Sequence, residues 1–143
     1  MFSKSCTYAI KTMIYLALQQ KSGLVYVGVT AVSEAIGSPR YFTAKILQQL
    51  SKAKLIDSQR GPNGGFYLPA DSQVSLADIV RVIDGDQLLD GCILGFEECS
   101  DLRPCPAHYK FKSVRDYLKG ALVTTHIEEL RQIVENENGF LKL

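Results

Sequence analysis

The sequence predicts a mainly α-helical protein that carries one small β-hairpin near its middle. Apolar residues recur at helical spacing in several segments, and two short strand-like segments flank an Asn-Gly pair. Ser-Pro and Ser/Thr-x-x-acid patterns mark several helix starts. With 143 residues, the chain is long enough for one compact domain with a real core and too short for two large ones.

The N-terminal segment predicts two helices separated by a short link. Residues 5–20 should form the first helix, because its apolar residues recur three or four positions apart and share one face. A short second helix should begin at Thr30, whose hydroxyl can cap it, and should end at Gly37. The apolar face of the first helix consists of Ala9, Met13, Leu16 and Ala17.

A third helix should start at Ser38 and run to about Ala53. Ser38 is the expected N-cap, and Pro39 suits the first helical position because its missing N–H costs nothing there. Two helices joined by a short turn that contains a glycine are typical of a helix-turn-helix. Many other helical hairpins share this pattern, so the prediction needs support from the residues after the third helix.

A predicted hairpin comes directly after the third helix and supplies that support. Residues 55–58 and 66–68 read as short strands, and Asn63-Gly64 between them favours a tight turn. A hairpin directly after the second helix of a helix-turn-helix is a wing. We therefore predict a winged helix-turn-helix domain over residues 1–84.

The next predicted element is a helix followed by a long loop. A Ser75-x-x-Asp78 pattern resembles a capping box, and it should open a helix that Gly85 closes. Residues 85–108 contain three of the four cysteines and are expected to form a loop. A loop of this length in a small protein is usually functional or disordered, and we interpret it as a sensor loop.

Two amphipathic helices should complete the chain. The first is expected from about Tyr109 to Val123, and a Thr125-x-x-Glu128 capping box should open the second. Both need a partner that covers their apolar faces after the winged domain is complete. We therefore expect residues 109–143 to be dimerisation helices of a homodimer.

Charge is distributed unevenly along the chain. Residues 1–70 carry eight basic and two acidic residues, a formal charge of +6, whereas residues 71–143 carry eight basic and 13 acidic residues, a formal charge of −5. This split predicts that the N-terminal half binds a polyanion such as double-stranded DNA. A chance distribution of surface charge is the alternative.

The composition also indicates the compartment. Hydrophobic residues make up 46% of the chain, and no apolar run approaches the roughly 20 residues that span a bilayer. The first residues lack the basic and apolar regions of a secretory signal. We therefore expect a cytoplasmic protein whose cysteines are thiols, ligands or core residues rather than disulfides.

The predicted DNA contacts lie at the start of the third helix and on the wing. In a helix-turn-helix the first residues of the second helix reach base edges in the major groove, and a cation on a hairpin tip can follow a phosphate. An ordinary solvated polar face is the alternative. The expected contact residues are Ser38, Arg40, Tyr41, Thr43, Lys45, Arg60, Gly61 and Asn63.

The sensor loop contains a possible metal site. Its pattern is Cys92-x6-Cys99-x5-Cys105-x2-His108, and soft thiolates select zinc, copper(I) or iron–sulfur clusters. Zinc is less favoured because the paired C-x2-C of a zinc ribbon is absent. The acidic residues between the cysteines should raise the thiol pKa values. A flexible loop with unused thiols is the alternative interpretation.

An enzyme is the main rival from another class of protein. The sequence lacks a Ser/His/Asp pattern, a phosphate-binding glycine loop and paired carboxylates with a supporting third group. Catalysis would require His108 beside a loop cysteine, and a ligand role explains this histidine better. We therefore predict that the chain is not an enzyme.

These motifs together resemble the Rrf-type winged-helix transcription regulators, the IscR/NsrR/CymR group, over nearly the whole chain. In helix 1 the resemblance rests on Tyr8-Ala9 and Leu16-Ala17, and in helix 3 it rests on Tyr41-Phe42 and Ile46–Leu50. It rests further on the wing string from Ser58 to Leu68 and on the three-cysteine loop downstream of it.

The resemblance implies a dimeric repressor built on a long C-terminal helix, which reads an imperfect palindrome. It also implies that Cys92, Cys99, Cys105 and His108 hold a two-iron iron–sulfur cluster that senses redox, iron–sulfur or nitrosative status. One departure is the first gap of six residues, where cluster-binding members typically have five. Another branch uses an N-terminal acidic ligand, and this chain has no acid before Glu34. Cluster-free members act through thiols or a partner protein, which is the alternative function.

Overall fold

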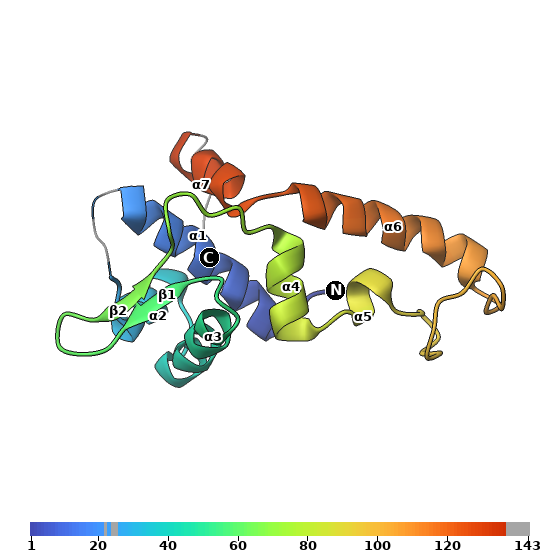
Figure 1. Ribbon diagram of the computed structural model, residues 1–143, viewed down its shortest axis with the longest axis horizontal. Helices are drawn as coiled ribbons and strands as arrows, with labels where there is room; N and C mark the ends of the chain where they lie inside the picture. Colours follow the sequence, from blue (N-terminus) through green and yellow to red (C-terminus); the bar gives the residue numbers. More distant parts are fainter. Residues whose placement is uncertain (22, 24–25, 137–143) are drawn as a thin grey trace.

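The computed structural model describes residues 1–21, 23 and 26–136. Figure 1 shows two parts: a lobe built around α1, and an arm that α6 and the loop before it extend away from the lobe. The mainly helical fold with a two-stranded hairpin confirms the predicted fold class. The elements in order are α1 (Lys4–Lys21), α2 (Val29–Ile36), α3 (Arg40–Lys52), β1 (Asp57–Gln59), β2 (Gly65–Tyr67), α4 (Leu76–Asp84), α5 (Gln87–Asp90), α6 (His108–Thr124) and α7 (Ile127–Asn136).

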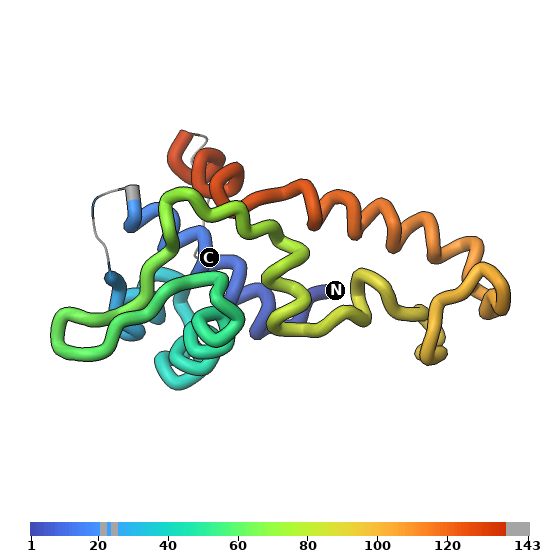
Figure 2. The backbone as a smooth tube through the Cα atoms, in the orientation of Figure 1, coloured from blue at the N-terminus to red at the C-terminus, as the bar shows by residue number. Residues whose placement is uncertain are grey.

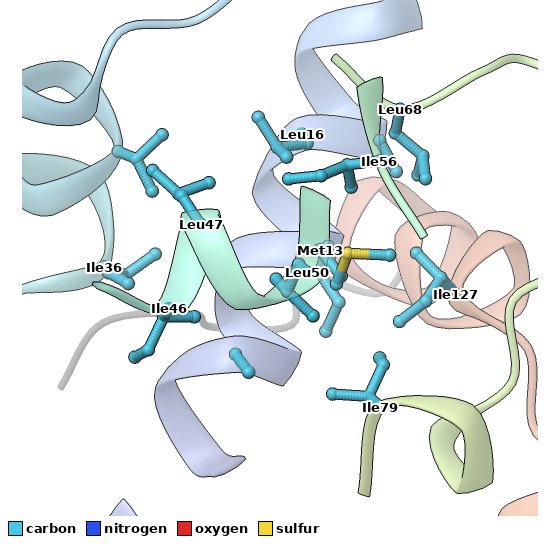
Figure 3. Close-up of a cluster of buried hydrophobic side chains, with 14 of the residues drawn as sticks. Met13, Leu16, Ile36, Ile46, Leu47, Leu50, Ile56, Leu68, Ile79 and Ile127 are labelled. Carbon is cyan, nitrogen blue, oxygen red and sulfur yellow. The ribbon is translucent and has the colours of Figure 1, made fainter. Parts of the chain in front are cut away.

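Helix α1 is the centre of the lobe and packs against α2, α3, α4 and α7. Figure 3 shows Met13 and Leu16 of α1 facing Leu47 and Leu50 of α3 within one apolar cluster, in which Ile127 of α7 also takes part. Each fully buried side chain of this size contributes roughly 1.5–3 kcal/mol. The core therefore holds α3 against the rest of the lobe, with the other face of that helix left in solvent.

The helix-turn-helix forms as predicted, with different caps. Gly37 takes the left-handed conformation at φ +68°, as expected of a residue that ends a helix. The N-cap of α2 is Gly28, two residues before the expected cap, Thr30. The N-cap of α3 is Pro39 rather than Ser38. The Ser38 hydroxyl is buried and hydrogen-bonds to the hydroxyl of Thr43 instead.

The hairpin pairs β1 and β2 antiparallel, with Ser58 opposite Phe66. Two glycines fit close backbone approaches. A Cβ on Gly64 would lie 2.0 Å from the carbonyl oxygen of Gln59, and one on Gly65 would lie 2.6 Å from that of Val27. Val27 and Phe66 also exchange two backbone hydrogen bonds of 2.8 Å. The wing is therefore anchored to the segment that precedes α2.

The capping box of α4 is confirmed, and the one expected at Thr125 is wrong. The Asp78 N–H donates to the Ser75 hydroxyl at 3.3 Å, while the Ser75 N–H donates to the Asp78 carboxylate at 2.9 Å. The Thr125 hydroxyl instead donates to the Ala121 carbonyl at 2.7 Å, at the end of α6. It therefore closes one helix and does not open the next.

Helix α7, within the predicted dimerisation segment, packs on the lobe. Its residue Ile127 is 2% exposed in the core of the lobe, and Leu130 and Val134 pack against the same core. The apolar face of α7 is thus covered by the chain's own α1, and this helix is part of the lobe. Residues 137–143 of the predicted dimerisation segment lie outside the described residues.

The predicted sensor loop contains a short helix, α5, which the sequence pattern does not predict. Leu89 of α5 is buried and packs with Val80 of α4 and Leu122 of α6. The cysteine loop proper, residues 91–107, begins after α5 and ends at α6. Figure 2 shows that this loop and the wing lie at opposite ends of the long axis. None of the described helices is long and apolar enough to cross a membrane.

Candidate functional site

The exposed face of α3 presents basic and polar side chains. Arg40, Tyr41 and Lys45 all lie on the surface, and the ring of Tyr41 is 77% exposed. The first turn of α3 contains no acidic residue. The opposite face of the helix is locked in the core, so the backbone that carries these side chains is fixed.

Two predicted contact residues are not on this face, which is a correction. Thr43 is fully buried, and Ser38 is 7% exposed. Their hydroxyls hydrogen-bond to each other, and the Ser38 carbonyl accepts a hydrogen bond of 2.8 Å from the Ser33 hydroxyl. These short polar side chains hold α2 and α3 together, and their burial excludes them from contact with a base edge.

The wing adds an exposed cation beside this face. The predicted wing contacts, Arg60, Gly61 and Asn63, are all exposed. A groove of about 470 Å³ runs between α3 and the wing. Its lining includes Lys52, together with Gln48, which the predicted contact set missed although it shares the exposed face of α3.

All four predicted ligands line one cavity at the other end of the molecule. The cavity measures about 600 Å³ and opens between α5, the cysteine loop and α6. Cys92 and His108 are buried, with 2% and 3% exposed, and the other two cysteines are half-buried. We call this cavity, with Cys92, Cys99, Cys105 and His108 on its wall, the cysteine pocket.

The four side chains form two pairs within the cysteine pocket. The Cys99 Sγ lies 3.4 Å from Nδ1 of His108. Cys92 and Cys105 interact with each other through their thiols. Among the described residues, no three His, Cys, Asp or Glu side chains converge closely enough to hold a single metal ion. The pocket as folded therefore offers two donors at each of two places.

The backbone of the loop favours ionisation of Cys92. Burial raises the pKa of this thiol, but hydrogen bonds from the backbone N–H groups of residues 94–96 and from the Cys105 thiol together outweigh burial and hold the pKa below its ordinary value. For Cys105, burial raises the pKa, and the nearby Cys92 adds to the rise. The acidic residues expected to raise every thiol pKa are not the controlling groups at Cys92.

Polar residues surround the histidine of the pocket. Nε2 of His108 lies 2.8 Å from the Asp101 carboxylate, which also accepts hydrogen bonds of 2.7 and 2.9 Å from Lys112. Arg115 donates to the Gly91 carbonyl at 3.1 Å and lies beside the Cys99 sulfur, which raises the pKa of the guanidinium.

The fourth cysteine, Cys6, lies in the interior of the lobe, far along the chain from the other three. It is fully buried in α1 and packs with Ala77 and Leu122. Burial and the neighbouring Asp84 raise the pKa of its thiol to about 12. Cys6 is therefore a core residue with no part in the cysteine pocket.

Comparison with known proteins shows which family the chain resembles. Residues 2–133 match the Rrf2 family model, described as "Iron-dependent Transcriptional regulator". A putative HTH-type transcriptional regulator of Aquifex aeolicus is 29% identical over 94% of this chain and 93% of its own length. The HTH-type transcriptional regulator IscR of Photorhabdus laumondii is 29% identical over 86% of this chain and 74% of its own length.

Solved structures agree on the fold. CymR of B. subtilis, described as the global cysteine regulator, superposes with a TM-score of 0.70 at 24% identity, over 92% of this chain and 96% of its own. IscR of T. potens superposes with a TM-score of 0.72 at 21% identity, over 97% of this chain and 91% of its own. The family consists of DNA-binding regulators and not of enzymes. The chain therefore belongs to the Rrf2 family of transcriptional regulators.

Proposed function

We propose that this regulator is a homodimer that reads an imperfect palindrome as a repressor, and that its cysteine pocket holds an iron–sulfur cluster of the two-iron type. The observation that carries the proposal is the convergence of three cysteines and one histidine on one cavity beside α6, at the opposite end from a basic helix and wing. DNA binding and signal sensing are thereby assigned to separate ends of the chain.

For DNA, the proposed base contacts come from Arg40 and Tyr41, with Lys45 one turn further along α3. An arginine that forks onto guanine O6 and N7 contributes about 1–3 kcal/mol of discrimination. On the wing we assign a phosphate or minor-groove contact to Arg60, while Gly61 and Asn63 bring the tip close to the backbone.

For the dimer, we propose that the outer face of α6 meets a second copy. Val114 and Tyr117 are 63% and 83% exposed on this helix, a high exposure for apolar side chains one turn apart. Leu122 of the same helix is 4% exposed and packs within its own chain, so it is not part of this face. A two-fold axis beside α6 would place the recognition helices about 34–36 Å apart, one turn of DNA.

For the cluster, the donor set of the cysteine pocket fits a two-iron site. Such a cluster needs two protein ligands on each iron, and the pocket holds one Cys–Cys pair and one Cys–His pair. A single-ion site needs three or four donors around one point, and the described residues offer none. When bound, a two-iron cluster supplies one-electron redox chemistry and sensitivity to oxidants or nitric oxide.

The chain's own packing suggests how the pocket could influence the lobe. His108 is the first residue of α6, and Leu122 near the other end of α6 packs with Leu89 of α5 and Val80 of α4. A change in the cysteine loop can therefore alter how α5 and α6 sit against the lobe. A coupling of about 1–3 kcal/mol changes the affinity for DNA about 5–150-fold.

A cluster-free thiol sensor is the second candidate. The observation that favours it is the Cys92–Cys105 contact, in which one thiol has a lowered pKa beside a second thiol. Such a pair is suited to forming a disulfide with an oxidant. One solved neighbour is described as an oxidised form of CymR from Staphylococcus aureus, at 24% identity.

The test is the visible absorption of anaerobically purified protein, with iron and acid-labile sulfide assays. We expect absorbance typical of a two-iron cluster, with equal amounts of iron and sulfide. Replacing Cys92, Cys99 or Cys105 with alanine should abolish the absorbance, whereas His108→Ala should shift it. Cys6→Ala is the matched control and should leave the spectrum unchanged. Protein without iron or sulfide, whose Cys92 and Cys105 become disulfide-linked on oxidation, would favour the second candidate.

A further inference from the structure

An acid of the cysteine loop and a lysine of α6 form a chain of contacts behind the pocket histidine. The His108 side chain is 1% exposed, and its two ring nitrogens have different neighbours. Nε2 faces the Asp101 carboxylate at 2.8 Å, while Nδ1 faces the Cys99 sulfur at 3.4 Å. Only Nδ1 is directed to the thiols of the cysteine pocket.

We propose that Asp101 is a positioning residue that keeps the proton of His108 on Nε2 and presents Nδ1, as the electron-pair donor, to the cysteine pocket. This inference rests on the proposed ligand role of His108. The contact between His108 and Asp101 is nevertheless present without a cluster, so the tautomer can be tested in cluster-free protein. Asp101 is not one of the predicted ligands. Its position in the sequence, between two cysteines, does not show that its carboxylate contacts His108.

The reason is the hydrogen-bonding capacity of a neutral imidazole, which has one donor and one acceptor nitrogen. With the proton on Nε2, the ring donates to the Asp101 carboxylate, and the Cys99 thiol can donate to Nδ1. The opposite tautomer would set the Nε2 lone pair against carboxylate lone pairs at a buried site. Histidines that bind metals commonly donate their other N–H to a carboxylate in this way.

Lys112 holds the Asp101 carboxylate in contact with His108. The side chain of Asp101 is 64% exposed, so its contact with His108 alone would compete with water. Lys112 contacts both of its oxygens, at 2.7 and 2.9 Å. Lys112 follows His108 by four residues on α6, so both lie on one face of that helix. One helix therefore carries both the ring and the cation that fixes the partner of the ring.

The direct test is the histidine tautomer in cluster-free protein, read by nitrogen-15 NMR in mildly alkaline buffer, where an ordinary histidine is neutral. His126→Gln assigns the signals of the other histidine. We expect the Nε2–H form of His108 in the wild type. Asp101→Ala should shift the tautomer ratio about tenfold or more toward Nδ1–H, because the variant lacks a charge-assisted hydrogen bond.

Three further variants separate positioning from a general effect on the loop. Asp101→Asn should keep most of the Nε2–H form, since its amide oxygen still accepts a hydrogen bond. Lys112→Met should give a smaller shift than Asp101→Ala. Asp71→Asn, which removes an exposed acid of the lobe, should change nothing. An Nδ1–H ring in the wild type, or an unchanged ratio in Asp101→Ala, overturns the proposal.

A second readout uses protein reconstituted with iron and sulfide. Asp101→Ala should shift the visible spectrum and release iron to a chelator about 10–100-fold more readily than wild type, with Asp101→Asn in between. Iron retention and spectrum equal to wild type in Asp101→Ala overturn the proposal. If the wild type itself forms no cluster, the proposed cofactor fails, and the tautomer measurement alone decides whether Asp101 positions His108.

Discussion

The basic surface and the cysteine pocket are supported in opposite ways. Arg40 and Lys45 stand on a helix whose other face is buried in the apolar core, so their backbone is fixed by the lobe alone. The cysteine pocket is walled by a loop without strands or helices over residues 91–107, where Ile93 and Phe96 are more than half exposed. The basic surface is thus held in place by the core of one chain, whereas the cysteine pocket is enclosed in large part by an exposed loop.

The largest expected effect comes from the core under the basic surface. Leu47→Ala should lower the free energy of unfolding by about 2–5 kcal/mol, because it leaves a cavity beneath α3. Leu94→Ala, in the cysteine loop, removes the same side-chain atoms from a residue that is 53% exposed. It should cost less than about 0.5 kcal/mol. Urea unfolding of both variants measures the difference, and equal losses of stability would remove the contrast between the two regions.

The next effect concerns the surface of α6 that joins the two regions. Val114→Asp should lower the affinity of the dimer at least about a hundredfold, because a carboxylate would be buried without a partner. Gln73→Asp places the same charge on an exposed loop of the lobe and should leave the dimer intact. Analytical ultracentrifugation measures both, and an unchanged dimer in Val114→Asp would move the interface away from this face.

Smaller effects should separate the helix from the wing within the basic surface. Arg40→Ala should relax the preference at one base pair at a cost of about 1–3 kcal/mol. Arg60→Ala should weaken binding to all sequences alike, because it removes a phosphate contact. Thr43→Val, on the buried face of the same helix, should alter stability and not base preference. Binding selection from a random DNA library distinguishes the three, and an altered base preference in Thr43→Val would restore it to the contact set.

The smallest expected effect is on salt dependence. Lys52 lies in the groove between α3 and the wing, where a phosphate contact is within reach. Lys52→Gln should reduce the slope of log affinity against log salt by roughly 0.9 for each phosphate that the dimer no longer neutralises. Fluorescence anisotropy over a salt series measures the slope. An unchanged slope would show that Lys52 contacts no phosphate, which would leave the phosphate contacts of this groove to the wing.

The parts of the fold that sequence predicts are those fixed by local chemistry. Ser75 and Asp78 form the capping box that their spacing predicts, and Gly37 ends α2 in the conformation that favours glycine. The wing is predicted in the same way from its turn residues and flanking strands, although the turn hydrogen bond joins Gly61 and Gly64 and so has Pro62 and Asn63 at its centre. In each case neighbouring residues decide the structure, so a single sequence is sufficient.

The predictions that fail are those in which a residue from another element determines the structure. A serine before a proline fits an N-cap, but the buried Ser38 hydroxyl pairs with that of Thr43, and the Ser38 carbonyl accepts a hydrogen bond from Ser33 of α2. The pattern of α7 shows an apolar face without showing that α1 covers it. Likewise, Cys99 and His108 are nine residues apart, and only the folded loop shows that they form a pair. The cysteine pocket could thus be predicted as a ligand set but not as two pairs.

The most direct test of the account is the DNA affinity of one preparation measured with its cluster present and after its anaerobic removal. The probe is a DNA fragment selected from a random library by the wild type. The account predicts roughly a 5–150-fold difference between the two forms. It also predicts that Cys92→Ala binds DNA with the affinity of the cluster-free wild type, both before and after the cluster-removal treatment. Equal affinity of the two wild-type forms would contradict the claim that the cysteine pocket controls DNA binding by the basic surface.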